Sequence, residues 1–172
     1  LALAQQHAAH AQPVEQALIA ALASRYPSSK PLDPAATQPV LVAYAAAMKQ
    51  VAKQYPADAD VQTLYAEALM NTNAWKLWST DGKAAPGTDE VVATLEAVLK
   101  AHPDHPGANH YYVHALEASP HPGTAVPSAE RLRSLMPAAG HLVHMPAHIM
   151  QRVGRYEDAA EANRRGAAAD LA

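Results

Sequence analysis

The sequence predicts an all-α fold, an α-solenoid built from antiparallel helix pairs. Alanine is abundant, and it favours helix and lets neighbouring helices approach closely. Apolar residues recur at helical spacing in segments that short turns of Pro, Gly or Asp separate. No segment shows the alternation that is typical of a strand.

The N-terminal half predicts a helix in the opening stretch and three further helices, over 13–27, 40–55 and 61–72. Pro13 suits the first turn of its helix, because proline there loses no helical hydrogen bond. The segment 26–39 contains four prolines and is predicted to be a loop.

The C-terminal half predicts four helices, over 88–103, 106–119, 127–137 and 155–170, and a separate histidine-rich helical stretch over 141–150. Thr88 is placed to cap the first of these helices. The Gly- and Pro-rich segment 73–87 is predicted to be an inserted loop whose two tryptophans cover an edge of the core. Pro146 predicts a kink in the stretch 141–150, or else the start of a helix there.

The chain is predicted to be one helical domain over 1–172. Both ends read as interrupted helices, so we expect a piece of a longer protein. A net charge of −3 gives no reason to expect nucleic acid as a partner, and no apolar run approaches a membrane span. With no cysteine, the sequence leaves cytoplasm and periplasm equally open, and any metal would need histidine, carboxylate or methionine ligands.

Two segments of the C-terminal half, "AHPDHPGANHYYVHAL" and "LMPAAGHLVHMPAHIM", align with an offset of 34 residues. In this alignment His110 falls on His144, and His114 falls on His148. Thirty-four residues is the period of the tetratricopeptide repeat (TPR), a two-helix unit that stacks into a superhelix. The sequence is therefore predicted to contain repeats.

The segment "GRYEDAAEANRR" resembles the turn and second helix of a TPR. The residues at the family's glycine, aromatic, small and closing proline positions are Gly154, Tyr156, Ala159, Ala160, Pro103 and Pro137. The sequence departs from the pattern at Asn163, which replaces a larger residue, and at Gly166, which replaces an alanine. The resemblance implies an α-solenoid whose first helices line a concave face, and it says far less about function.

Metal-ligating side chains occupy equivalent positions in the first helix of successive repeat units. Alignment of the earlier unit, "TLYAEALM", places Glu67 at the position that His114 and His148 occupy. Adjacent helices pack ~8–10 Å apart, so side chains from two of them can share one ion. The predicted metal ligands are Glu67, His110, His114, His144 and His148.

Further side chains are expected to line the groove or to orient these ligands: Asn109, Tyr111, Tyr112, Glu117 and His141. A nitrogen-rich ligand set suits zinc, copper, iron or nickel, whereas calcium and magnesium prefer oxygen. Met145 and Met150 lie nearby in the sequence and leave copper open as the ion.

Three functions stay open on the sequence. The first is a TPR-type scaffold that binds a protein or peptide in its concave groove, with a transition metal as an additional ligand. The second is a metalloenzyme with a metal held by histidine and glutamate. It is less favoured, because the sequence has no zinc-protease helix motif and no phosphate-binding loop. The third is a purely structural repeat segment whose histidines are packing residues.

Overall fold

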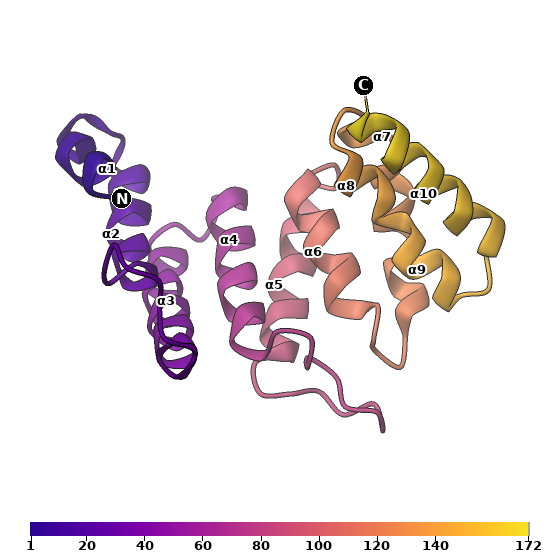
Figure 1. The fold of residues 1–172 in the computed structure, drawn as a ribbon, viewed down its shortest axis with the longest axis horizontal. Helices are drawn as coiled ribbons and strands as arrows, with labels where there is room; N and C mark the ends of the chain where they lie inside the picture. Colours follow the sequence, from indigo (N-terminus) through magenta and orange to yellow (C-terminus); the bar gives the residue numbers. More distant parts are fainter. Residues whose placement is uncertain (172) are drawn as a thin grey trace. The chain divides into compact units, whose positions relative to one another are not determined.

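The computed structural model describes residues 1–171 and divides the chain into two compact units, Leu1–Ala74 and the part from Trp75 onward. The regular structure of both described units is helical, apart from one isolated bridge between Trp78 and Ala84 (Figure 1). No helix within residues 1–171 has both the length and the apolar character that a bilayer span needs. The all-α prediction is confirmed.

The N-terminal unit stacks three main helices in chain order. Its elements are α1 (Ala2–His7), the 3₁₀ turn η1 (Ala8–His10), α2 (Pro13–Arg25), α3 (Pro34–Gln54), α4 (Ala59–Met70) and η2 (Asn71–Asn73). Helix α3 packs against both α2 and α4. Their shared core contains Met48, Val61 and Ala68, all fully buried.

Helix α3 begins earlier than the sequence predicts. The side chain of Asp33 accepts a hydrogen bond from the backbone N–H of Ala35 at 2.8 Å and so caps the helix at Pro34. The loop expected over 26–39 therefore ends at Asp33. Pro39 lies inside α3, where it removes one hydrogen bond near the start of a 21-residue helix.

The C-terminal unit contains a long loop followed by a stack of helices. The helical elements are α5 (Thr88–Ala101), α6 (Pro106–Leu116), η3 (Pro122–Ala125), α7 (Val126–Leu135), α8 (Gly140–His144), α9 (Pro146–Arg152) and α10 (Tyr156–Asp170). Helix α6 packs against α5 and α7, and α9 packs against α7 and α10. The 34-residue offset makes α6 equivalent to α8 together with the first part of α9, and α6 also contacts α9.

The core of this unit consists of large aliphatic side chains from several helices. Leu95, Val113, Leu132, Ile149 and Met150 are all fully buried. Each comes from the inward face of its helix, as the apolar periodicity of the sequence requires. This packing fixes the backbone from which the histidines project.

The loop before α5 differs from the prediction at two positions. Gly87, in the left-handed region at φ 88°, stands at the N-cap position, and the hydroxyl of Thr88 donates to the Leu77 carbonyl instead of capping the helix. Trp75 is 88% exposed and does not cover a core edge. Trp78 is half-buried and donates from Nε1 to the carbonyl of Ala115 at 2.7 Å, which ties the loop to α6.

The histidine-rich stretch is divided into two helices at Met145. Helix α8 ends at His144, and Pro146 is the first residue of α9. Proline at this position loses no helical donor, because the first N–H groups of a helix have no partner within it. Of the two roles predicted for Pro146, the helix start is the one the structure contains.

Helices α8 and α10 approach each other through two glycines. A Cβ placed on Gly166 would lie 2.8 Å from the carbonyl oxygen of Gly140 and 2.9 Å from the Cβ of His144. A Cβ on Gly140 would meet the carbonyl oxygen of Gly166 at 2.6 Å. The glycine that departs from the TPR pattern therefore permits a contact that alanine would block.

We predict that Gly166→Ala lowers the free energy of unfolding by about 1–3 kcal/mol, the usual cost of overpacking. In an uncrowded helix the same substitution would raise it by about 0.5–1 kcal/mol. Urea unfolding followed by circular dichroism measures the sign. Ala167→Gly, at an exposed position of the same helix, calibrates the propensity effect. A more stable Gly166→Ala protein would contradict the close contact.

Candidate metal centre

Five histidines and one glutamate gather in the C-terminal unit, where α6 and α8–α9 face each other. We call this group the histidine cluster: His110, His114, Glu117, His141, His144 and His148. Two of its members come from α6, one directly follows α6, two come from α8 and one from α9. The cluster is thus built from two successive repeats.

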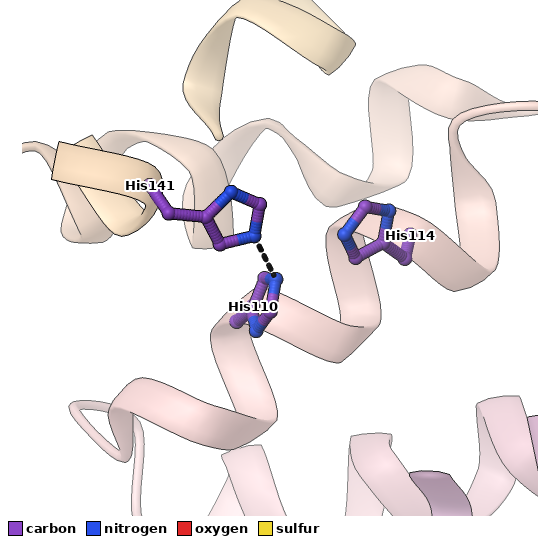
Figure 2. A group of neighbouring side chains, drawn as sticks. All are labelled: His110, His114 and His141. Carbon is purple, nitrogen blue, oxygen red and sulfur yellow. Dashed lines mark hydrogen bonds between the residues drawn. The ribbon is translucent and has the colours of Figure 1, made fainter. Parts of the chain in front are cut away.

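The first part of the cluster contains three imidazole rings (Figure 2). The Nε2 atoms of His110 and His141 lie 3.0 Å apart, and the ring of His110 also stacks on Tyr111, with centroids 4.9 Å apart. His114 lies one helical turn after His110, with its ring centroid 4.9 Å from that of His110. One ligand atom from each of the three histidines lies within 4.8 Å of the other two, as binding of one ion requires.

The second part of the cluster is centred on Glu117, the residue that follows α6. Its Oε1 atom lies 3.0 Å from Nδ1 of His114, and its Oε2 atom contacts Nδ1 of His148. These three side chains form a second group whose ligand atoms lie within 4.8 Å of one another. Because His148 belongs to α9, the carboxylate joins two repeats.

His144 and Asn163 extend the cluster towards α10. The Nε2 atoms of His144 and His148 lie 3.0 Å apart, and Nδ1 of His144 lies 2.6 Å from Oδ1 of Asn163. The imidazole of His144 is therefore held at both of its nitrogens. Asn163 was not among the predicted site residues, although its departure from the TPR pattern was a signal in the sequence.

Burial and mutual repulsion keep part of the cluster neutral. Desolvation, with the nearby charges of His114, His141 and His148, lowers the pKa of His110 to about 4. Burial and neighbouring histidines also lower the pKa of His141. Near pH 7 these rings are neutral, and a neutral imidazole has the lone pair that binds a metal ion.

Glu117 supplies the negative charge of the cluster. Burial alone would raise the pKa of its carboxyl group, but hydrogen bonds with His114 and His148 lower it to about 2. The group is therefore a carboxylate throughout the physiological range. It offsets positive charge at the centre, whether that charge is a proton or a metal ion.

All four histidines predicted as ligands lie in the cluster, but His144 belongs to neither of the two ligand groups. His141 and Glu117, expected as surrounding groups, lie inside the cluster and belong to the two potential ligand groups. Glu67 belongs to the N-terminal unit, where its carboxylate accepts a hydrogen bond from Asn71, and neither ligand group includes it.

Two further residues that were predicted to line the groove or to orient the ligands, Asn109 and Tyr112, are buried. Asn109 is fully buried instead of lining a surface groove, and its amide donates to the carbonyls of Pro103 and His105. Tyr112 is buried and donates to Glu96 at 2.7 Å, and burial with this bond raises its pKa.

Met145 and Met150 are fully buried. Their sulfur atoms therefore belong to the core of the unit.

No protein-family model matches the sequence, and no curated protein sequence matches it significantly. Among solved structures the chain is similar to "MamA MSR-1 C2", a TPR-like helical protein, with a TM-score of 0.60 and 17% sequence identity. The similarity covers 95% of this chain and 80% of that chain. At this identity the likeness shows the fold alone, and that fold is an all-α solenoid of TPR type.

We predict that the metal-free protein loses stability as the pH falls from about 6.5 towards 4. Unfolded His110 takes up a proton near pH 6.5, whereas the folded residue resists protonation down to about pH 4, so acid favours the unfolded state. The measurement is the Tm in EDTA at a series of pH values above 4.5. His110→Gln should show a smaller decrease of the Tm with falling pH than the original protein. Parallel curves of Tm against pH for the two proteins would contradict the assignment of this decrease to His110.

Proposed function

We propose that the C-terminal unit binds a transition-metal ion, with His110, His114 and His141 as ligands on a TPR-like helical scaffold. The single observation that carries the proposal is that one ring nitrogen from each of three histidines, contributed by two repeats, lies within 4.8 Å of the other two. His110 and His114 come from one helix of the repeat, and His141, which has no histidine counterpart in the 34-residue alignment, joins them from the next repeat.

The distances within this group suit a metal ion. Two nitrogens that each lie 2.0–2.1 Å from one zinc ion at a tetrahedral angle are about 3.3–3.4 Å apart. The Nε2 atoms of His110 and His141 lie 3.0 Å apart, so an ion between them requires shifts of only a few tenths of an ångström. Small rotations of exposed or half-buried rings supply such shifts.

The surroundings of the group also support metal binding. Glu117 contacts Nδ1 of His114, and a carboxylate on the far nitrogen is the usual partner of a metal-bound histidine, because it fixes the ring and raises its basicity. His141 is exposed, so the ion can enter from solvent and one coordination position stays accessible. Three imidazoles and an open position suit zinc, copper or iron.

The TPR-like fold supports a second property, the binding of a protein or peptide partner, because stacked repeats offer an extended surface. This remains a prediction from the fold. The histidine cluster is the more specific feature, because its side chains bring ligand atoms close together in two groups, whereas a protein-binding surface needs only residues spread along it.

We predict that protein purified without an affinity tag binds Zn²⁺. The double substitution His110→Gln/His141→Gln should weaken binding by more than about 100-fold, because loss of a residue that only orients a metal ligand already costs up to about that much. Isothermal titration calorimetry and elemental analysis measure affinity and stoichiometry. The matched control is His102→Gln/His121→Gln, which removes two exposed histidines outside the cluster. Equal loss in both double variants would show nonspecific binding and contradict the proposal.

A further inference from the structure

A second set of ligands lies beside the first and shares one residue with it. His114, Glu117 and His148 form their own group of converging ligand atoms. His114 reaches both groups with different atoms. Its Nδ1 contacts Glu117, and Figure 2 shows a ring nitrogen turned towards His110 and His141, which must then be Nε2. The imidazole of His114 therefore lies between two points where ligands converge.

A count of hydrogen atoms indicates that a cation belongs in the second group. The side chains His144 and His148 make three contacts, to Asn163, to each other and to Glu117. Asn163 and Glu117 present oxygen atoms that only accept hydrogen bonds, and two neutral imidazoles have only two N–H groups. One of the three contacts is left without a hydrogen atom.

All three contacts are satisfied together when a cation stands between His148 and Glu117. In that arrangement His144 donates from Nδ1 to Asn163 and His148 donates from Nε2 to His144, which uses both hydrogens of the two neutral rings. Nδ1 of His148 then directs a lone pair at a carboxylate oxygen. Two electron-rich atoms in contact require a positive charge between them, which is either an additional proton or a metal ion.

We propose that a second transition-metal ion binds between His148 Nδ1, Glu117 and His114 Nδ1, so that the cluster holds two ions with the imidazole of His114 between them. This inference rests on the proposed function, because both ions share His114. Binding of both ions removes the ring proton of His114 to solvent and leaves it as an imidazolate. His144 and Asn163 orient His148 without binding the ion themselves.

The second site differs from the first in charge. The first group consists of three imidazole rings, whereas the second includes the carboxylate of Glu117, which stays ionised in the physiological range. The carboxylate and the imidazolate offset half of the charge that two divalent ions bring into a half-buried cluster. Zn²⁺ and Cu²⁺ accept such mixed nitrogen and oxygen ligands.

The test is the stoichiometry of Zn²⁺ binding to the purified chain, measured by calorimetry and elemental analysis after dialysis. We expect two ions in the original protein and one in both Glu117→Gln and His148→Gln. Glutamine removes a ligand of the second site and also the carboxylate that orients His114, so the one remaining ion should bind about 10–100-fold more weakly than in the original protein, whereas His148→Gln keeps that carboxylate in place. Glu161→Gln, which changes an exposed carboxylate of α10, is the control and should bind two ions.

A spectroscopic measurement tests the shared imidazole directly. With Cu²⁺, the integrated EPR signal at low temperature should be lower at two equivalents than at one, because two Cu²⁺ ions bridged by His114 couple antiferromagnetically. In His148→Gln the signal should not decrease between one and two equivalents. A signal that rises in proportion to added copper in the original protein would overturn the bridge.

The outcomes separate the two proposals. One ion in the original protein, lost in His110→Gln/His141→Gln and retained in His148→Gln, would overturn the second site and leave the first, with a proton between His148 and Glu117. No bound ion at all would overturn both. Circular dichroism of each metal-free variant establishes that it is folded before its stoichiometry is compared.

Discussion

The contact of one carboxylate with two imidazoles is the constraint on which the cluster depends. Glu117 stands at the C-terminal end of α6, where the chain leaves the helix, and it contacts His114 of its own repeat and His148 of the next. The half-buried carboxylate requires partners, because an unpaired buried charge is costly. Those partners in turn fix the orientation of the rings that face His110 and His144.

The geometry has a simple cause in the repeat. A solenoid places residues of equal position on neighbouring helices, so a histidine pair at i, i+4 that occurs in two repeats becomes a patch of four. His110 and His114 on α6 are matched in this way by His144 and His148. The close approach of α8 and α10 at Gly140 and Gly166 then holds the backbone of His144 in place.

Periodicity in the sequence predicted the helical fold and the four repeat-matched histidines, because both depend on local spacing. It could not predict that Glu117 and His141 belong inside the cluster, since their contacts cross between repeats and depend on side-chain orientation. Glu67, expected from alignment alone, pairs with Asn71 in its own unit, and its role as a ligand stays a prediction. The departures from the TPR pattern, Asn163 and Gly166, were the informative positions, as both lie against His144.

The origin of the ligands in two repeats has a consequence for cooperativity. In a repeat protein each unit has its own stability, and neighbours are coupled only by their shared interface. An ion held by α6 on one side and by α8 or α9 on the other adds its binding free energy to that interface and to no single helix. Repeats that would otherwise open one after another would then unfold together, so a metal-loaded protein would differ from the metal-free one in the sharpness of unfolding as well as in its midpoint.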